Sequence, residues 1–502
     1  MTTASPHEAA PEGKVEGFGS KAYRAYVMTA LFIVYMFNFI DRTLIGVLGE
    51  PIRETFGLSD AMIGLLSGPA FAILYTLLGI PCAMLAERMN RGTIIAVAMA
   101  TWSAFTAFCG MANSTFMFAL GRIGVGIGEA GCSPPSHSLI SDYFPPEKRG
   151  TALAVYSLGI PIGTMLASLS GAYFATQAGL DWRSAFIWLG LPGVVIALVF
   201  KLTVKEPPRG YSDPGGVQAA EDKPSPFEVF GVIARKPTFW HVAIGGGLAS
   251  FVGYGVGQFV TPFFLRVYKL PLMEAALLYG LILGVFSAVG TFLSGFLADR
   301  IRERHPNAYS WLPAIGFFAS APAYAIGYNT VAFLDGAAAI WVAMPFFIIG
   351  AVMHYFYLSA QFAVTQNLVS PRMRATASAV LLFMVNIIGY AAGPPTVGWV
   401  SDKAAAFNLS QMESPVDLGT CNLYEKEMRD EATRTAEKGE ALSTYCAPAR
   451  ANGIRFAVTF GVMIYIWAGI HFMLMGRTLQ RDTWSAVPVK PKEEELPEPE
   501  TP

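Results

Sequence analysis

The sequence predicts an all-α membrane protein of about twelve transmembrane helices, built as two homologous halves of six helices each. Of its 502 residues, 53% are hydrophobic and only 14% are charged, whereas soluble globular chains carry about 25% charged residues. Apolar runs of roughly twenty residues recur along the whole chain, which is the length that a helix needs to cross a hydrocarbon core of about 30 Å. Two pairs of sequence motifs, each repeated six helices apart, indicate the halves.

The expected spans are bounded by charged or proline-rich segments, and they centre on Tyr35, Ala72, Ala100, Gly126, Leu166, Leu191, Gly253, Gly284, Phe317, Phe347, Ile387 and Ile466. These spans divide into six-helix bundles over residues 21–204 and 237–480. Residues 205–236 are the expected linker, with a short surface helix from Phe227 to Ile233. Residues 1–20 and 481–502 are polar and have no apolar face to bury, so both are expected to be disordered tails.

Basic residues fall in alternate short connections, which gives the orientation. They are Arg88 and Arg91, Lys148 and Arg149, Arg300, Arg302 and Arg304, and Arg372 and Arg374. By the positive-inside rule these connections lie in the cytoplasm, together with the linker and both termini. We therefore expect a multi-pass protein of the bacterial inner membrane.

The polar connection over residues 402–450 lies on the opposite, exported side and holds Cys421 and Cys446, two of only five cysteines in the chain. Both thiols would meet an oxidising compartment. A pair confined to one exported loop favours a disulfide over two unrelated free thiols. Cys82, Cys109 and Cys132 fall inside spans and are expected to be small packing residues.

The internal repeat rests on two independent motif pairs. The sequence Leu-Ala-Glu-Arg at residues 85–88 closes the second span, and Leu-Ala-Asp-Arg at 297–300 closes the eighth; residues 146–155 open the fifth span, and the similar residues 371–380 open the eleventh. The first pair is offset by 212 residues and the second by 225, so one insertion of 13 residues reconciles them. Parallel halves of this kind place a binding site near the midplane and permit alternating access by rocking.

The ends of spans two and eight resemble the loop signature of the major facilitator superfamily, Gly-x-x-x-Asp-Arg-x-Gly-Arg. Residues 295–304 match it in part and residues 83–91 match it loosely, and the resemblance covers residues 24–476. It implies a gating charge relay at the cytoplasmic face, with Glu87, Arg88, Arg91, Asp299 and Arg300. Positive-inside flanking alone would explain the arginines but not the carboxylates.

Four ionisable residues lie inside the spans of the first half: Asp41 and Arg42 in span one, and Arg122 and Glu129 in span four. Ionisable groups within a span are costly and usually face a cavity or one another. Arg122 and Glu129 are seven residues apart, so they lie on one helix face about 10 Å apart in height. We expect Asp41 to pair with Arg122, and only a long side chain such as Arg42 to reach Glu129. The alternative is a buried structural network.

Glycine alternates with apolar residues between Arg122 and Glu129, at positions 124, 126 and 128. No strand precedes this segment, so it is not a dinucleotide-binding fingerprint. Small residues in a membrane helix allow its neighbours to approach closely, and they leave room beside Glu129.

The motif Asn38-x-x-Asp41-Arg42 in span one, together with Arg122-x-Gly-x-Gly-x-Gly-Glu129-Ala in span four, resembles the Spinster family of the superfamily. Animal members of that family move lysophospholipids or sphingosine-1-phosphate. The resemblance implies a role in proton coupling for Asp41, and a place in the central polar network for Arg42, Arg122 and Glu129. We assign proton coupling to Asp41 and Glu129, and substrate binding to Asn38 and the two arginines. The long exported loop has no counterpart in the resemblance.

The second half carries almost no full charges inside its spans. Its polar residues, which we assign to substrate binding, are Tyr254, Gln258, His354, Tyr357, Gln361 and Asn386. A charged half that faces an aromatic, apolar half suits an amphipathic ligand. His354 could titrate, but a single histidine among aromatic residues favours a hydrogen-bonded packing role.

A proton-coupled secondary transporter of amphipathic anionic lipids is therefore the expected function. A membrane enzyme is the main rival class, but the six histidines are scattered and neither HExxH nor GxSxG occurs. A receptor or scaffold would not need midspan carboxylates. The alternative substrates are small organic anions such as sugar acids, since Arg42 and Arg122 would bind a carboxylate as well as a phosphate. We expect a monomer in contact with membrane lipids, with no cofactor, no metal and no nucleic acid.

Overall fold

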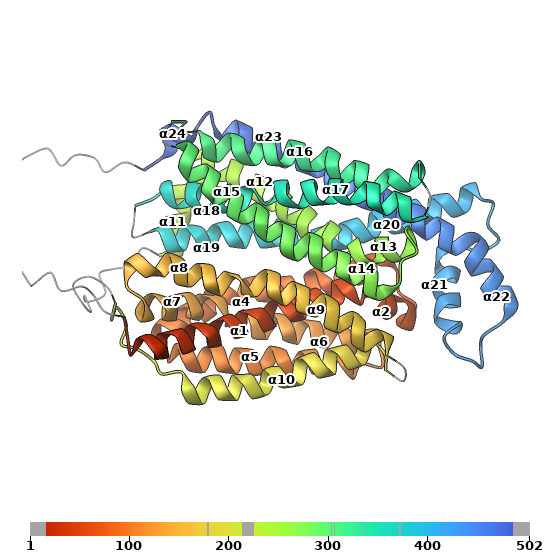
Figure 1. The fold of residues 1–502 in the computed structure, drawn as a ribbon, viewed down its shortest axis with the longest axis horizontal. Helices are drawn as coiled ribbons and strands as arrows, with labels where there is room; N and C mark the ends of the chain where they lie inside the picture. Colours follow the sequence, from red (N-terminus) through yellow and green to blue (C-terminus); the bar gives the residue numbers. More distant parts are fainter. Residues whose placement is uncertain are drawn as a thin grey trace, which may run out of the picture.

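The computed structural model describes residues 17–177, 180–212, 225–302, 304–305, 307–334, 336–370 and 373–484. Two groups of helices lie side by side, with their axes along the long dimension of the molecule (Figure 1). This arrangement confirms the predicted all-α fold of two six-helix halves. We call the end where α1 begins and α24 lies the tail end, and the end that carries α21 and α22 the loop end.

The first half runs from α1 to α10. Three of its spans are interrupted within the bundle, after Ser67, Glu129 and Ser157. Its helices are α1 (Lys21–Val47), α2 (Gly49–Phe56), α3 (Asp60–Ser67), α4 (Pro69–Arg88), α5 (Arg91–Gly110), α6 (Thr115–Glu129), α7 (Ser133–Tyr143), α8 (Pro146–Ser157), α9 (Gly159–Thr176) and α10 (Trp182–Thr203).

The second half runs from α12 to α24, and two of its spans contain a π-helical turn, a feature often found at functional sites. Its elements are α12 (Pro237–Gly257), α13 (Val260–Arg266), α14 (Leu272–Tyr279), η1 (Gly280–Phe286), α15 (Ser287–Arg302), α16 (Ala308–Asn329), η2 (Thr330–Ala332), α17 (Gly336–His354), α18 (Tyr357–Asn367), α19 (Arg374–Val385), η4 (Asn386–Ala391), α20 (Gly393–Gln411), α21 (Leu418–Glu427), α22 (Ala436–Ala441), η5 (Leu442–Cys446), α23 (Ala447–Met475) and α24 (Leu479–Asp482).

Ten helical segments in the described part of the chain are long and apolar enough to cross a membrane. The two expected spans that fall short have identifiable reasons. The fourth consists of α6 and α7, which carry Arg122 and Glu129 and are separated by a turn over residues 130–132. The ninth, α16, is a helix of 22 residues that contains Pro313 and Pro322 together with several Tyr, Ser and Gly residues of low hydropathy.

A repeated aromatic pair shows the relation between the halves. Tyr35 of α1 stacks on Tyr156 of α8 with ring centroids 4.1 Å apart and an interplanar angle of 13°. Tyr254 of α12 stacks on Tyr390 of η4 with the same centroid distance of 4.1 Å and the same angle of 13°. The first pair joins spans one and five and the second joins spans seven and eleven, so the pairs occupy equivalent places six helices apart.

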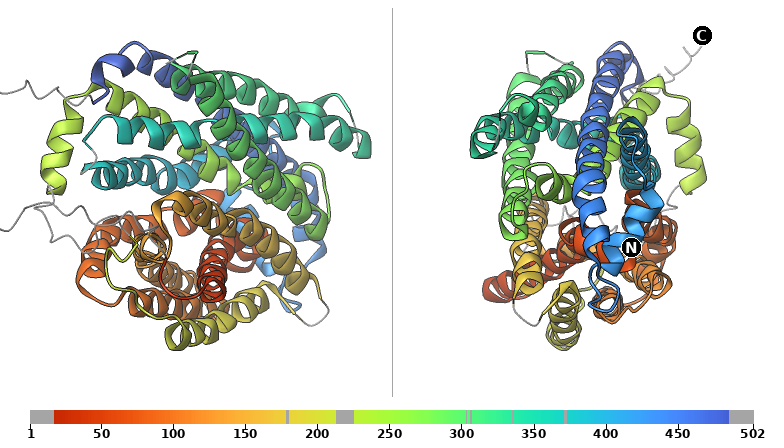
Figure 2. Two further views of the ribbon diagram at one scale, coloured as in Figure 1. Left: turned by 60° about the vertical axis from the view of Figure 1, so that its left-hand side comes forward. Right: turned by 90° about the vertical axis from the view of Figure 1, so that its right-hand side faces the viewer.

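Two elements lie outside the bundles. The expected linker helix is present as α11 (Pro226–Ala234), which packs against α12 and α19 and crosses their direction at the tail end (Figure 2). Val229 and Ile233 are buried in this contact, whereas the Phe227 side chain is exposed. At the loop end, α20 continues to Gln411 and α23 begins at Ala447, so helix extends into both ends of the 402–450 segment.

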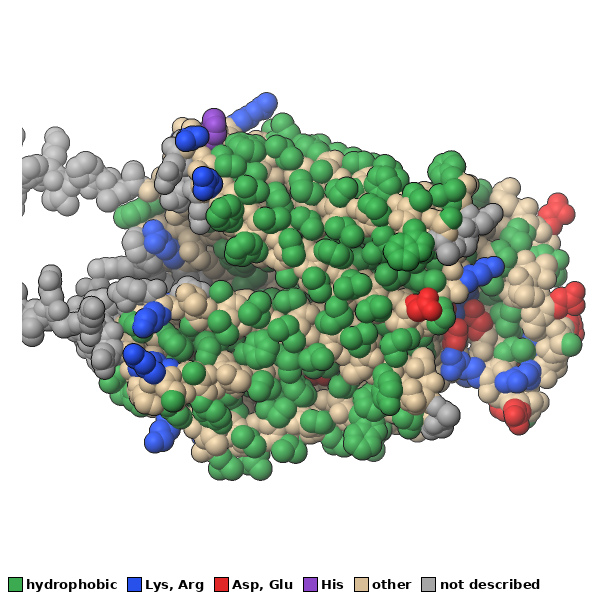
Figure 3. Space-filling view, in the orientation of Figure 1, with side chains coloured by type: hydrophobic (Ala, Val, Ile, Leu, Met, Phe, Trp, Pro, Cys, Tyr) green, Lys and Arg blue, Asp and Glu red, His purple; other side chains and the backbone are tan. Residues whose placement is uncertain are grey.

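The two halves meet at the loop end and separate toward the tail end. At the loop end, α3 of the first half packs on α20 of the second. In Figure 3 the surface is hollowed between the halves at the tail end, where exposed Lys and Arg side chains also gather. The structure is therefore the conformation that opens at the tail end.

Candidate functional site

An ion pair lies between α1 and α6 inside the first half. The Arg42 Nε atom is 2.6 Å from Oε2 of Glu129, and Glu129 is only 1% exposed. The Arg42 guanidinium also lies over the rings of Tyr75 and Phe71, at 4.5 and 5.1 Å from their centroids. Aromatic faces and one carboxylate together hold this cation out of water.

Asp41 and Arg122 are equally buried, at 1% exposure each. Both carboxylate oxygens of Asp41 and the Nε and Nη2 atoms of Arg122 have no hydrogen-bond partner among the protein atoms described. The expected Asp41–Arg122 pair is thus absent from this conformation. Neighbouring residues of a helix point about 100° apart, so Asp41 and Arg42 leave α1 in different directions.

Asn38 completes the polar group on α1. It is fully buried, and neither atom of its side-chain amide has a hydrogen-bond partner among the described protein atoms. Unpaired buried polar atoms are rare, because each costs roughly 1–3 kcal/mol. These unpaired atoms lie beside the Arg42–Glu129 ion pair, so the described protein atoms alone do not satisfy the hydrogen-bonding groups of the site.

The glycines of α6 bring this group together. A β-carbon at Gly126 would overlap the backbone carbonyl of Phe71 on α4, and one at Gly128 would lie 2.6 Å from the backbone nitrogen of Trp102 on α5. At Gly124 it would overlap the ring of Phe105. As the sequence predicted, the small residues let α4 and α5 approach α6 closely.

Two tyrosines of the second half face this charged group. Tyr390 lies 5.1 Å from Phe71 between ring centroids, and Phe71 in turn lies under Arg42. Tyr254 stacks on the other side of Tyr390. Asn386 begins the same π-helical turn that carries Tyr390. Of the second-half residues assigned to substrate binding, Tyr254 and Asn386 therefore belong to elements that meet the first-half charges.

The other assigned residues of the second half have different surroundings. The Gln258 Nε2 atom donates to the carbonyl oxygen of Ile45 at 2.9 Å, which is a contact between the halves. His354 lies among Tyr324, Tyr328 and Tyr465, with which it lines a narrow cavity of about 20 Å³. Its Nδ1 atom is 3.3 Å from the Tyr324 hydroxyl, in the packed setting expected of a structural histidine.

Tyr357 and Gln361 lie on α18 and are buried inside the second half. Tyr357 packs against Phe317 and Phe472, with ring centroids 5.4 and 6.4 Å away. Gln361 lies against Gly246 of α12. These two side chains pack within the second half.

The residues assigned to gating lie at the tail end and differ in exposure and in their ion-pair partners. Glu87 and Arg88 are exposed at the end of α4, and Arg300 is exposed on α15. Arg91 is 1% exposed and forms ion pairs with Asp142 and, at 2.6 Å, with Glu206. Both partners belong to the first half or to the start of the linker. The Asp299 side chain lies outside the described residues.

A second charged cluster, at the loop end, was not found from the sequence. Arg266 of α13 binds Glu50 and Asp60 of the first half, at 2.6 and 2.7 Å. Arg53 binds Glu50 at 2.8 Å and Glu425 of α21 at 2.6 Å. The signal was present as acidic and basic residues beside span ends at the loop end, which the positive-inside rule does not explain.

Electrostatics keep this cluster ionised. Burial acts to raise the pKa of Glu50, but the guanidinium groups of Arg266 and Arg53 outweigh it and lower the pKa to about 2. The carboxylate of Asp402 also accepts hydrogen bonds from the backbone N–H groups of Asp60 and Ala61, at 3.0 and 2.8 Å. The first turn of α3 is thereby capped by a residue of the other half.

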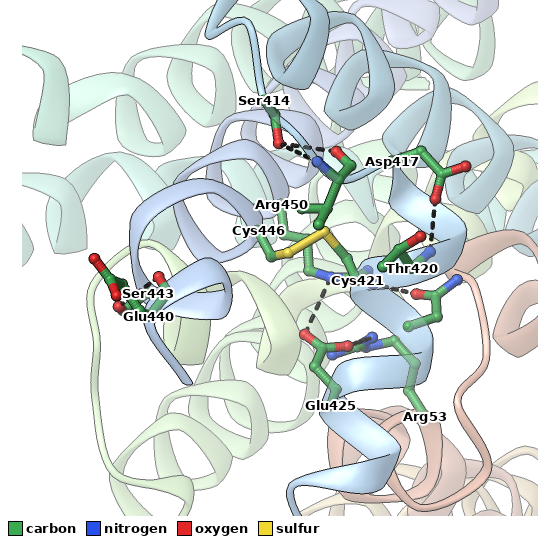
Figure 4. The surroundings of a disulfide bond; sticks show 12 residues. Arg53, Ser414, Asp417, Thr420, Cys421, Glu425, Glu440, Ser443, Cys446 and Arg450 are labelled. Atoms are coloured by element: carbon green, nitrogen blue, oxygen red, sulfur yellow. Dashed lines mark hydrogen bonds and ion pairs between the residues drawn. A yellow bond between two sulfur atoms is a disulfide. The ribbon is translucent and has the colours of Figure 1, made fainter. Parts of the chain in front are cut away.

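Cys421 and Cys446 are joined by a disulfide with an S–S distance of 2.04 Å, and both are fully buried (Figure 4). The bond links α21 to the end of η5. One helical turn beyond each cysteine lie Glu425 and Arg450, whose Oε1 and Nε atoms are 3.1 Å apart.

Comparison with known proteins identifies the family of the chain. Residues 31–394 match the Major Facilitator Superfamily. The crystal structure of a bacterial homologue of the human lysosomal transporter Spinster, in an inward-facing and unoccupied conformation, superposes with a TM-score of 0.82 at 38% sequence identity. That match covers 93% of this chain and 100% of the other.

Three curated relatives are also similar. An "MFS-type efflux pump" of Mycolicibacterium smegmatis is 34% identical over 377 residues, which is 74% of this chain and 83% of the relative. Protein spinster homolog 3 of Danio rerio is 29% identical over 77% of this chain and 79% of its own length. A "Probable L-galactonate transporter" of Escherichia coli is 28% identical over 58% of this chain and 65% of its own length.

Proposed function

The chain belongs to the Major Facilitator Superfamily and is a transporter of the Spinster type rather than an enzyme, and on this basis we propose that it moves amphipathic anionic lipids by proton-coupled alternating access. The lipid is of the lysophospholipid or sphingosine-1-phosphate class. The observation that carries the proposal is the buried Arg42–Glu129 pair, which faces the stacked rings of Tyr254 and Tyr390 across the two halves.

The two sides of the site match the two parts of such a lipid. A phosphate headgroup binds a guanidinium through charge-assisted hydrogen bonds. Arg42 and Arg122 supply two guanidinium groups in the first half, and Arg122 has unpartnered nitrogen atoms. The second half offers aromatic surface for an acyl chain, including the stacked rings of Tyr254 and Tyr390.

Proton coupling follows from competition for the arginines. An unpaired charge is costly to bury, so a carboxylate without a cation tends to bind a proton, whereas one beside a guanidinium releases it. Glu129 has a guanidinium beside it, and Asp41 has no hydrogen-bond partner among the described protein atoms. When the headgroup takes Arg42, Glu129 loses its partner and binds a proton. Rocking of the halves then carries lipid and proton together.

We further propose that the tail end faces the cytoplasm and that the loop end faces the exported side of the bacterial inner membrane. Exposed basic side chains, such as Arg88 and Arg300, lie at the tail end. The disulfide lies at the loop end, and disulfides form and persist in oxidising compartments such as the exported side. One chain contains both halves of the site, so a monomer suffices for transport.

Small organic anions such as sugar acids are the second candidate substrate class. The Escherichia coli relative named an L-galactonate transporter favours it, and a guanidinium binds a carboxylate as readily as a phosphate. A sugar acid has no acyl chain to lie against the aromatic residues of the second half.

Transport in proteoliposomes decides between the two. Vesicles containing the purified protein receive an imposed pH gradient and either a fluorescent lysophospholipid or radiolabelled galactonate. The proposal expects gradient-driven movement of the lysophospholipid and none of galactonate. Galactonate transport alone would establish the second candidate, and movement of neither would reject both substrate classes.

A further inference from the structure

The segment from Leu418 to Cys446, which contains α21, α22 and η5, is attached to the second half by more than its chain ends. The disulfide from Cys421 to Cys446 fixes α21 to the beginning of α23. Beside it, Arg450 of α23 binds Glu425 at 3.1 Å and also Asn422 (Figure 4). Three cross-links within about one helical turn therefore make α21 a rigid part of the second half.

The same segment reaches across to α2 of the first half. The second carboxylate oxygen of Glu425 lies 2.6 Å from Nη1 of Arg53, whose side chain is 1% exposed. Arg429, just beyond α21, pairs with Glu54. The left-handed Gly57 that ends α2 faces the carbonyl oxygen of Asn422. Glu425 thus bridges an arginine of each half.

The bridge continues into the loop-end cluster. Arg53 binds Glu50, Glu50 binds Arg266, and Arg266 binds Asp60. From Arg450 through Glu425 to Asp60, six buried or nearly buried side chains alternate in charge. Three of the contacts in this chain join opposite halves: Arg53 with Glu425, and Arg266 with both Glu50 and Asp60.

A contact biases a conformational equilibrium only if it is made unequally in the two states. A charge on a flexible loop could follow Arg53 when the halves rock, and the pair would then persist in both states. Glu425 cannot follow, because the disulfide and Arg450 hold it to α23. The ion pair between Arg53 and Glu425 must therefore break when the loop end opens. Separating these two largely buried charges costs free energy.

We propose that the segment from Leu418 to Cys446 is a latch that holds the loop end closed, and that Glu425, positioned by the disulfide, is the residue through which it acts. The latch goes beyond the proposed transport function, since it sets the balance between the two access states whatever substrate is carried. Neither Glu425 nor Arg450 belongs to the site around Arg42.

Hydrogen–deuterium exchange of the full-length protein in lipid nanodiscs tests the latch without substrate or pH gradient. The variants are Glu425→Gln, which keeps the shape and the disulfide, and the double variant Cys421→Ser, Cys446→Ser, which removes the covalent link. The matched control is Glu427→Gln, because Glu427 lies on the same helix but binds Lys438 within the segment, at 2.9 Å.

Both latch variants should make the amides of α2 exchange roughly tenfold faster, and the amides of α18 and α19 at the tail end exchange more slowly. The reciprocal change is required, because opening one end closes the other. Glu427→Gln should match the wild type at both ends. Unchanged exchange in α2 of Glu425→Gln overturns the proposal. Faster exchange in α2 and α21 with no slowing at the tail end also overturns it, since that result describes local loosening.

Discussion

The Arg42 Nε atom and the Glu129 carboxylate are 2.6 Å apart, and the other carboxylate oxygen of Glu129 has no hydrogen-bond partner among the described protein atoms. Among the described residues, Arg42 is therefore the only cation within ion-pair distance of Glu129. Any anion that takes Arg42 leaves this carboxylate buried and unpaired. In the proposed mechanism, substrate binding and the protonation of Glu129 are linked through the Arg42 guanidinium.

The first prediction is that Glu129→Gln separates binding from coupling. Without its carboxylate partner, Arg42 is free for the headgroup, so the variant should bind lysophospholipid about tenfold more tightly at neutral pH. Uptake driven by a pH gradient should be lost. Ligand titration and proteoliposome flux measure the two effects, with the exposed Glu274→Gln as control. Normal flux with unchanged pH dependence would mean that the ion pair is structural.

The second prediction concerns Asp41, whose two oxygens are buried without a partner. Asp41→Asn replaces a group that can ionise with a neutral one of the same shape, so folding should be preserved and thermal stability in detergent equal to or above the wild type. Gradient-driven transport should be abolished while ligand binding remains. A large loss of thermal stability would show instead that the Asp41 carboxylate makes a required structural bond.

The third prediction is chemical. Cys421 and Cys446 should be oxidised in protein purified without reductant, because the segment that carries both cysteines faces an oxidising compartment in the proposed orientation. Mass spectrometry of a non-reduced digest should recover the linked peptide. The cysteines of the spans, at positions 82, 109 and 132, provide the internal control and should appear as free thiols. Alkylation of Cys421 or Cys446 in fresh, unreduced protein would contradict the bond.

The fold could be predicted from the sequence because membrane solvation leaves few alternatives. Long apolar segments must form helices to satisfy their backbone hydrogen bonds, and basic loops fix the alternation of the ends. The interruptions within the spans could not be predicted. The π-helical turns at Gly280–Phe286 and Asn386–Ala391 consist mostly of ordinary apolar residues, so their positions depend on packing between helices rather than on local preference.

The site could be predicted in part because charged groups are costly inside a membrane. Charges inside a span are so rare that Asp41, Arg42, Arg122 and Glu129 were identified individually, but helix rotation decides which of them meet. The loop-end cluster was missed because Glu50 and Arg53 stand outside any span, where charged residues are ordinary. The ion pair of Glu50 with Arg266 depends on how the two halves meet, and no periodic pattern in the sequence indicates that contact.

The fourth prediction tests the close approach of α4 to α6. Gly126→Ala would place a β-carbon against the carbonyl of Phe71, and backbone cannot yield as a side chain can. We expect the variant to lose roughly 1–3 kcal/mol of stability through overpacking, and to lose transport because Arg42 rests on Phe71. Gly79→Ala on α4 is the control, since nothing lies within 4 Å of its added carbon. Equal melting temperatures for the two variants would contradict this packing.

The last prediction concerns pH at the loop end. Because the pKa of Glu50 is lowered from 4.5 to about 2 by Arg266 and Arg53 against the effect of burial, its stabilisation of the closed state is complete above pH 4.5 and is lost only as the pH falls toward 2. Glu54 has the opposite sign: burial and the charge of Glu50 raise its pKa, so its contribution favours the closed state at acid pH. Mild acidification should therefore leave the loop end closed.

The measurement is a distance between spin labels attached to non-natural ketone side chains at the exposed positions Met111 and Phe333, one on each half. Asp41→Asn and Glu129→Gln are present in every sample, so that the site inside the bundle cannot respond to pH. The distance should stay constant from pH 7.5 to pH 5. Glu50→Gln added to this background should lengthen it already at pH 7.5, because Arg266 then loses one of its two carboxylate partners across the halves. A distance that lengthens between pH 7.5 and pH 5 without that substitution would show that Glu50 is not held ionised by the two arginines.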